Sequence, residues 1–229
     1  MVEMTKDLAS AVRKYALREG ADIVGVSSAR SYDAAPKGYR PCDLMEGAKS
    51  VVTLAVALPS AALENVPSRE YSVSYTKGND EANRIAFRLS RYLEDEGYRA
   101  IHVPASPPYD VRRNMGDLSH RHAAVLAGLG VLGKNSLLLN PKYGARIRLV
   151  SVITDAFLKP DKEMDVDLCG SCVRCIRACP AKALKGKGVV DKEACDRQHV
   201  LVGRRLQLAG PEQICGVCIS VCPVGKPVR

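Results

Sequence analysis

Apolar residues recur over the first 160 residues with the spacings of alternating helices and strands. The helical period predicts helices over 6–19, 80–96 and 118–127, and a glycine that ends the helix follows each of them directly. Thr5 is the expected N-cap of the first helix, and Asp117 or Ser119 that of the third. Shorter apolar runs predict strands over 22–27, 50–58, 99–103, 136–139 and 146–154. This alternation indicates an α+β domain over residues 1–160, with a buried sheet covered by helices.

The remaining part, residues 161–229, is marked by its cysteines. It holds eight of the nine, in the runs CGSCVRCIRACP (169–180) and CGVCISVCP (215–223), with Cys195 between the two runs. Closely spaced cysteines followed by a Cys-Pro pair are typical of two-cluster ferredoxins, in which the last cysteine of a run ligates the other cube. The sequence therefore predicts a small ferredoxin-like domain with two [4Fe–4S] clusters.

The same rule assigns the ligands of each cube. The cluster-one cysteines are predicted to be Cys169, Cys172, Cys175 and Cys222. The second cube lacks a ligand, because Glu212 stands where a regular run would have a cysteine, and Cys195 can replace it if a loop brings it back. The cluster-two cysteines are therefore predicted to be Cys179, Cys195, Cys215 and Cys218. A pair of structural zinc sites is the alternative, although zinc motifs usually divide their cysteines into separate CxxC knuckles.

Length and charge limit the function further. About 160 residues remain beyond the cysteine-bearing part, so the chain is expected to do more than carry clusters. Cys42, in that remainder, is expected to be a small half-buried residue, because eight cysteines already suffice for two cubes. The formal charge of +9 falls to roughly +5 once eight thiolates around two cubes are counted. Such a charge permits nucleic-acid binding without indicating it.

Neither a membrane-spanning segment nor a leader is expected in this chain. No apolar stretch reaches the length of about 18 residues that a spanning helix needs, and the first residues include acidic side chains without an apolar core. Cysteines in such a chain are expected to be reduced thiolates rather than disulfides. These features predict a cytoplasmic protein that does not act at a membrane.

A glycine-rich loop at residues 128–135 matches two phosphate-binding motifs by its letters. GLGVLG fits GxGxxG, and the following Lys134 and Asn135 nearly complete a P-loop. Both motifs need a strand before the glycines and a helix after them, whereas here a predicted helix precedes and a predicted strand follows. A dinucleotide or nucleoside triphosphate site is therefore not favoured, and contact of this turn with another large cofactor stays open.

Several segments together resemble one family. These are GADIVGVSS, AKSVVTLAV, AGLGVLGKNSLLL, the strand ending in ITD, and the two cysteine runs with their closing CP. In their order they resemble the epoxyqueuosine reductases and their shorter relatives, which are related to reductive dehalogenases. The resemblance implies a nitroreductase-like α/β sandwich domain that binds cobalamin, next to a two-cluster domain that passes electrons to the cobalt. It also supports Cys195 as the eighth ligand.

The resemblance suggests candidate site residues, and the chain also differs from the family pattern at several points. Asp117 and His120 are the candidates for proton transfer, with an N-cap and a hydrogen-bonded helix histidine as their structural alternatives. The family's catalytic acid lies in a D-[ST]-x-P segment, where this chain has Asn114, and the printed chain stops soon after Cys222 whereas tRNA-acting relatives are longer. No DxHxxG signature supplies a lower ligand to cobalt. The residues expected to hold cobalamin are Asn114, Met115, Gly128, Leu129, Gly130, Gly133, Lys134 and Asn135.

Three functions fit these observations. The first is an enzyme that relays single electrons through two [4Fe–4S] clusters to cobalamin and so reduces a small molecule or the corrinoid of another protein. The second is an epoxyqueuosine reductase acting on tRNA. The third is a non-catalytic electron carrier whose larger domain is a docking module, with flavin in place of cobalamin. Each needs a low-potential electron donor such as ferredoxin or flavodoxin.

Overall fold

A computed structural model describes residues 2–106, 110, 113–208 and 214–225, so Glu212 lies outside the described residues. The chain divides into two compact units. Unit 1 comprises residues 1–56, 79–129 and 148–164, and unit 2 comprises residues 57–78, 130–147 and 165–229. The sequence places a single boundary at 160/161. In the structure, unit 2 also contains two segments from before this boundary, residues 57–78 and 130–147. The second of these contains most of the glycine-rich loop.

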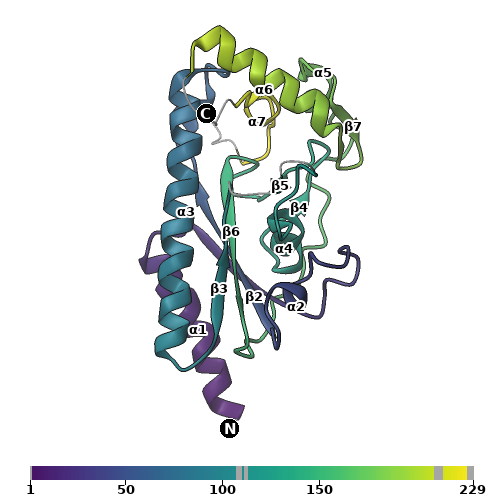
Figure 1. Cartoon of the computed structure of the whole chain (residues 1–229). Helices are drawn as coiled ribbons and strands as arrows, with labels where there is room; N and C mark the ends of the chain where they lie inside the picture. The colour runs from purple at the N-terminus through teal and green to yellow at the C-terminus, as the bar shows by residue number, and fades with distance from the viewer. Residues whose placement is uncertain (1, 107–109, 111–112, 209–213, 226–229) are drawn as a thin grey trace. The chain divides into compact units, whose positions relative to one another are not determined.

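Unit 1 is built on a four-stranded sheet in the order β1–β2–β6–β3 (Figure 1). The strands are β1 Ile23–Ser28, β2 Ser50–Ala57, β6 Ile147–Thr154 and β3 Ala100–Val103. The pairs β1/β2 and β3/β6 are antiparallel, with Val26 opposite Val52 and Ile101 opposite Ile153. Each strand lies within two residues of a predicted one, because apolar runs of this length bury well on both faces of a sheet.

Helices cover both faces of this sheet, as the alternation of β2 shows. Val52 and Leu54 pack with α1 (Val2–Arg18) and α3 (Arg69–Asp95), in a core that includes Ile85 and Leu89. Val51, one residue out of step, points to the other face and packs with Leu118 and Ala123 around α4 (His120–Leu126). The short α2 (Pro41–Leu44) lies in the segment that completes this second layer. The predicted α+β fold with a helix-covered sheet is confirmed.

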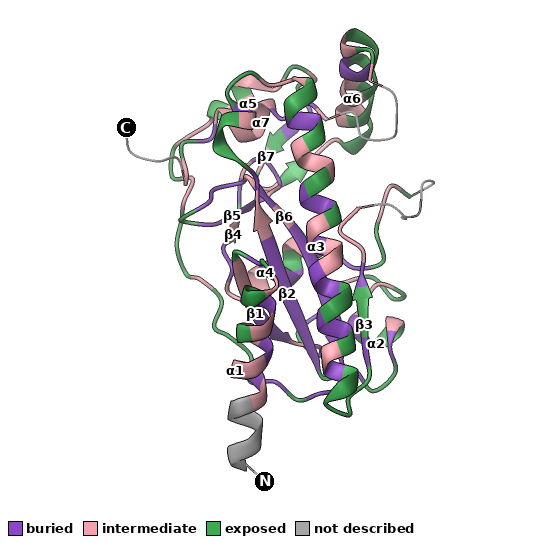
Figure 2. Cartoon of the chain, turned by 90° about the vertical axis from the view of Figure 1, so that its left-hand side faces the viewer, coloured by how far each residue is buried: buried purple, intermediate pink, exposed green. Residues whose placement is uncertain are grey.

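The predicted helix ends are less accurate than the helices themselves. The first helix begins at Val2, so Thr5 lies inside α1 and is not its N-cap. The helix α3 begins at Arg69, eleven residues before the predicted start, and its buried residues from Asn79 onward belong to unit 1 (Figure 2). The N-cap position of α4 is Ser119 and not Asp117, without a side-chain cap bond. None of the described helices has the length and apolarity to cross a membrane.

Unit 2 is assembled from short elements. It holds the hairpin β4 Val131–Leu132 and β5 Leu138–Leu139, and a second hairpin, β7 Leu184–Gly186 and β8 Val189–Val190. Its helices are η1 Ser60–Leu63, α5 Arg174–Ala178, α6 Lys192–Leu206 and α7 Val217–Ser220, together with the first residues of α3. The predicted strand 136–139 shortens to β5, because Ser136 has a φ of 62° and belongs to the turn. The buried apolar residues of unit 2 form small separate clusters.

Candidate iron–sulfur centre

The cluster-one cysteines share one cavity of unit 2. All four line it, although Cys222 lies 47 residues along the chain from Cys175. Cys175 comes from α5, while Cys222 follows α7 and is buried against Leu139 and Ala145. Four convergent thiols are the donor set that a [4Fe–4S] cube requires. The donor chemistry of this cavity therefore fits the predicted cube.

The glycine-rich loop reaches the same cavity. Lys134 and Asn135, which form the turn between β4 and β5, line the cavity beside the cluster-one cysteines. The backbone N–H of Lys134 donates to Cys169 Sγ at 3.5 Å. Its ammonium donates to the carbonyl oxygens of Gly170 at 2.6 Å and Cys172 at 3.1 Å. Lys134 therefore fixes the loop that carries the first two thiols.

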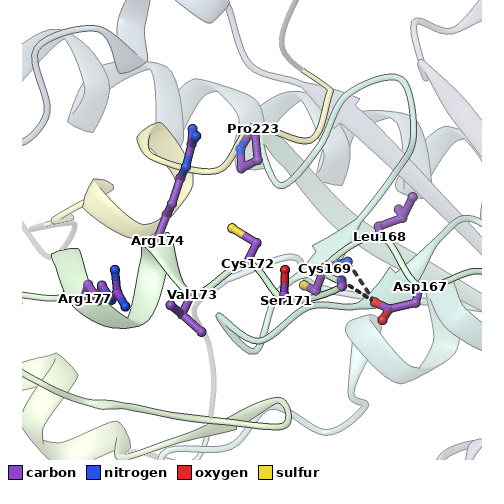
Figure 3. Close-up of a pocket in the computed structure, with 10 residues that line it drawn as sticks. Asp167, Leu168, Cys169, Ser171, Cys172, Val173, Arg174, Arg177 and Pro223 are labelled. Carbon is purple, nitrogen blue, oxygen red and sulfur yellow. Dashed lines mark hydrogen bonds between the residues drawn. The ribbon is translucent and has the colours of Figure 1, made fainter.

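A carboxylate holds this cysteine loop from its other end. Asp167 Oδ1 accepts hydrogen bonds from the backbone N–H groups of Cys169 and Gly170, each at 2.9 Å (Figure 3). The bonds from Gly170 and Cys169 lower the pKa of Asp167 below its usual value. The same loop borders an open hollow of about 690 Å³, which Arg174 and Arg177 of α5 also line. Polar contacts thus hold the cluster-one loop at the surface of unit 2.

The cluster-two cysteines also lie together, and their mutual effects on ionisation show it. Burial, followed by the charges of Asp196, Cys179 and Cys215, raises the pKa of Cys195 to about 11. Burial raises the pKa of Cys218 to about 12, and Cys195, Cys215 and Cys179 contribute to that rise. The structure therefore brings Cys195 to the three cysteines with which the sequence groups it.

Cys195 reaches this position from a helix and not from a loop. It lies in the first turn of α6, whose N-cap Asp191 accepts a hydrogen bond from the Ala194 N–H at 3.0 Å. One turn later, His199 Nε2 lies 3.7 Å from Cys195 Sγ. The backbone N–H of Ala183 donates to Cys179 Sγ at 3.3 Å. The expected loop is thus wrong, and a capped helix aims the eighth thiol.

The two sets of cysteines are neighbours within unit 2. The helix α5, which carries Cys175, packs against α7, which carries Cys218. Consistent with this contact, Cys175 is among the charges that raise the pKa of Cys218. The two sets of cysteines are therefore adjacent within unit 2.

The residues expected to hold cobalamin make contacts with protein instead. A Cβ on Gly128 would overlap the Lys162 carbonyl, and Leu129 is buried against Gly25 in unit 1. In unit 2, a Cβ on Gly130 would overlap the Leu139 carbonyl. These glycines serve close backbone packing, so the open cradle that a large cofactor requires is not seen at them within either unit.

The segment before α4 gives the same result. Asn114, with a φ of 49°, sits in a turn closed by paired backbone bonds between Asp110 and Met115, at 2.9 and 3.2 Å. Arg113 donates its backbone N–H to Asp110 Oδ1 at 3.1 Å and its guanidinium to the Tyr39 hydroxyl at 2.8 Å. Asn114 and Met115 therefore belong to a closed turn within unit 1, and they do not fit cobalamin on the contacts described.

The two candidates for proton transfer differ. His120 Nδ1 is paired with Ser151 Oγ at 3.0 Å, and Nε2 is paired with the Pro104 carbonyl oxygen at 2.9 Å. Burial lowers the pKa of His120 to about 4, so its ring is neutral at pH 7. Asp117 is exposed in the bend before α4. His120 thus has the contacts of a structural histidine, while Asp117 remains a candidate.

Cys42 stands apart from the other cysteines. It belongs to unit 1, on α2, and is exposed rather than half-buried as expected. Its only described bond is a weak one from Sγ to the Ala48 carbonyl oxygen, at 3.8 Å. Among the described residues, no three His, Cys, Asp or Glu side chains lie close enough together to bind one metal ion, and the four cluster-one thiols instead line a shared cavity.

Comparison with known proteins agrees with the cysteine geometry. Residues 168–225 match a protein-family model described as a 4Fe-4S double cluster binding domain, which spans all eight cysteines of unit 2. This match supports two [4Fe–4S] clusters over paired zinc sites. An epoxyqueuosine reductase of Cyclobacterium marinum is 32% identical over 204 residues, covering 82% of this chain and 62% of that protein. Over most of its length this chain is similar to the epoxyqueuosine reductase-like iron–sulfur proteins.

Solved structures extend the family relation to the fold. An epoxyqueuosine reductase with an epoxyqueuosine-modified tRNA-Tyr stem loop matches 96% of this chain and 65% of its own, with a TM-score of 0.69 and 24% identity. The catabolic reductive dehalogenase NpRdhA matches 97% of this chain and 32% of its own, with a TM-score of 0.77 and 22% identity. The chain spans 52–62% of the length of the first curated relatives that it matches.

Three contributors to the candidate cluster site of this chain were not predicted from the sequence. Asp167 lies two residues before Cys169, a spacing at which an aspartate bonds the following backbone, and this signal was available. His199 lies four residues after Cys195, but only a predicted helix would have placed the two on one face. The contact of Lys134 with the cysteine loop gave no local signal, because 35 residues separate Lys134 from Cys169.

Proposed function

We propose that this chain is an iron–sulfur oxidoreductase of the epoxyqueuosine reductase type, whose two [4Fe–4S] clusters deliver electrons to an epoxide on a tRNA base. The observation that carries the proposal is the gathering of eight cysteines of one unit into two sets of four. The names of the relatives favour this substrate over the small molecule or corrinoid that was the first expectation.

The clusters suit the electron count of such a reaction. Removing an epoxide oxygen to leave a double bond consumes two electrons and two protons and releases water. Each [4Fe–4S] cluster passes one electron at a time, so two transfers from a low-potential donor such as ferredoxin or flavodoxin complete one turnover. Because the clusters need reduced thiolates, we place the protein in the cytoplasm.

Cobalamin has no step in this proposal. The resemblance assigns it to the glycine-rich loop and the segment before α4, and the contacts of those residues with protein do not fit it. Titration of the reconstituted chain with cobalamin and with flavin, followed by visible spectroscopy, tests this separately. A base-off cobalamin spectrum at stoichiometric protein would restore cobalamin to the reaction.

The substrate is tested with the anaerobically reconstituted chain and a tRNA stem loop that carries epoxyqueuosine. Given a low-potential reductant, we expect conversion to queuosine, detected by mass spectrometry of the digested RNA. Restoration of queuosine in a strain that lacks the reductase is the matching test in cells. Reducible clusters without conversion would refute the substrate and favour a pure electron carrier. Asp117→Asn should slow conversion and leave cluster reduction unchanged if Asp117 supplies a proton.

A further inference from the structure

Asn135 carries a buried donor that has no partner in the described part of the chain. The residue is 4% exposed, and its Oδ1 accepts the backbone N–H of Leu137 at 3.2 Å. Its Nδ2 is fully buried and makes no hydrogen bond among the described residues. Leaving such a donor unpaired costs the full desolvation penalty of the group. A buried amide of this kind indicates a partner that protein atoms do not provide.

The position of Asn135 identifies the chemistry of that partner. Asn135 lines the cavity of the cluster-one cysteines, and Lys134 lines it too. The Lys134 backbone N–H already points at Cys169 Sγ, and its ammonium is fixed 2.6 Å from the Gly170 oxygen. The cavity therefore presents two N–H donors and one nearby positive charge to sulfur.

The turn leaves these donors little freedom. The Gly133 N–H donates to the Leu137 carbonyl at 2.8 Å, and the Gly133 carbonyl accepts from Ser136 at 2.9 Å. A Cβ on Gly133 would come within 2.7 Å of both Asn135 Oδ1 and the Leu139 side chain. Only glycine fits there, so the turn places both donors before any cluster is bound. Preorganised donors exert their full effect on charge, because no ordering cost is left to meet.

We propose that Asn135 and Lys134 donate N–H···S hydrogen bonds to cluster one and hold its reduction potential above that of cluster two. Reduction adds negative charge to the cube, and donors on its sulfur atoms stabilise that charge. Cluster two also has donors, from Ala183 and His199. However, α6 carries the carboxylates of Asp191, its N-cap, and Asp196, the residue after Cys195, and negative charge near this thiol opposes reduction there. Electrons therefore run downhill from cluster two to cluster one.

This inference rests on one part of the proposed function, namely that each set of four cysteines holds a [4Fe–4S] cluster. The test is a redox titration of the full reconstituted chain followed by EPR, with cluster two as the internal reference. In wild type, cluster one should be reduced at the higher potential. Asn135→Leu should lower the reduced-to-oxidised ratio of cluster one roughly tenfold at a fixed potential, about 59 mV for a one-electron couple. The potential of cluster two should not move.

Matched variants separate the lost donor from other effects. Asn135→Asp keeps the acceptor for Leu137 but replaces the donor by a charge, so it should lower the potential of cluster one further than Asn135→Leu. Asn140 is a second buried asparagine of the same hairpin, and its Oδ1 accepts from Lys142 and Tyr143 outside the cavity lining. Asn140→Asp should therefore shift cluster one less than Asn135→Asp. Equal shifts from the two Asp variants would overturn the proposal.

A measurement on wild type keeps the proposal decidable if Asn135→Leu does not assemble. Exchange into deuterated buffer should shift the Fe–S stretching bands of cluster one in resonance Raman spectra, because its sulfur atoms accept exchangeable N–H groups. Cluster-one bands that do not respond to exchange would overturn the proposal, as would an unchanged potential in Asn135→Leu. If wild type contained both cubes but showed no deuterium shift and no change of potential in Asn135→Leu, the proposed function would still stand. Wild type without iron–sulfur clusters would overturn both.

Discussion

The two cysteine runs begin alike and are held differently. Each opens with a Cys-Gly pair whose glycine has a positive φ, 47° at Gly170 and 75° at Gly216. A Cβ on Gly170 would meet nothing within 4 Å, whereas one on Gly216 would overlap the ring of Tyr71. Polar bonds from Asp167 and Lys134 hold the first loop. The second is held by an apolar cluster of Leu58, Leu63, Tyr71 and their neighbours.

The difference has a consequence for charge at the two sites. Burial is the first cause of the raised pKa of Cys218, Cys195 and Cys215 in the cluster-two set. In the cluster-one set a clear rise is found for Cys175. An apolar surrounding opposes the extra electron of a reduced cube as it opposes a thiolate. One motif, set in two kinds of surroundings, can thus produce two clusters of different potential.

The largest expected effect comes from replacing Cys195, the one predicted ligand that lies outside the two cysteine runs. Cys195→Ser should leave one cube of about four irons where wild type has about eight, with cluster one still reducible. Iron analysis and EPR of the reconstituted chain measure this. Cys42→Ser, in unit 1, is the control and should keep about eight irons. A Cys195→Ser protein with about eight irons would contradict the assignment of Cys195.

Replacing the two matched glycines tests the difference in how the loops are held. Gly170→Ala should cost about 1 kcal/mol, because only the left-handed backbone is strained. Gly216→Ala should cost roughly 2–5 kcal/mol, because overlap with Tyr71 adds to the same strain. Anaerobic thermal unfolding, followed by bleaching of the cluster absorbance, compares the two. Equal losses in both variants would show that Tyr71 does not support the second loop.

Much of this site could be predicted from the sequence, for identifiable reasons. The crossing of Cys179 and Cys222 follows from a local rule about cysteine runs, so it needed no knowledge of the fold. The position of Cys195 followed from counting ligands, although its helix did not. The helix α6 has only a moderate apolar pattern, and its one clear signal was the N-cap Asp191. Strands such as β2 were predicted because their apolar runs are long and bounded.

Most of the glycine-rich loop lies in a different unit from the one that the sequence interpretation gave it, for a physical reason. Its letters suggested a cofactor site of the first domain, since residues 128–135 follow a helix of that domain. In space, however, the chain passes from unit 1 to unit 2 between Leu129 and Gly130. The transition depends on β4 pairing with β5 and on Leu139 packing near Cys222. Such long-range contacts leave no local pattern, so Lys134 and Asn135 were assigned to the wrong unit.

The smallest expected effect concerns His199, which donates to cluster two when its Nε2 carries the proton. Its Nε2 lies 3.7 Å from Cys195 Sγ, a long contact for a hydrogen bond, so its contribution should be small. His199→Leu should lower the reduced-to-oxidised ratio of cluster two roughly threefold at a fixed potential, and so widen the gap to cluster one. His122→Leu is the control, because His122 bonds Ser119 in unit 1. A rise in the potential of cluster two in His199→Leu would mean that His199 does not donate to Cys195. The ordering of the two clusters would then rest on the carboxylates of α6 and the donors of the β4–β5 turn alone.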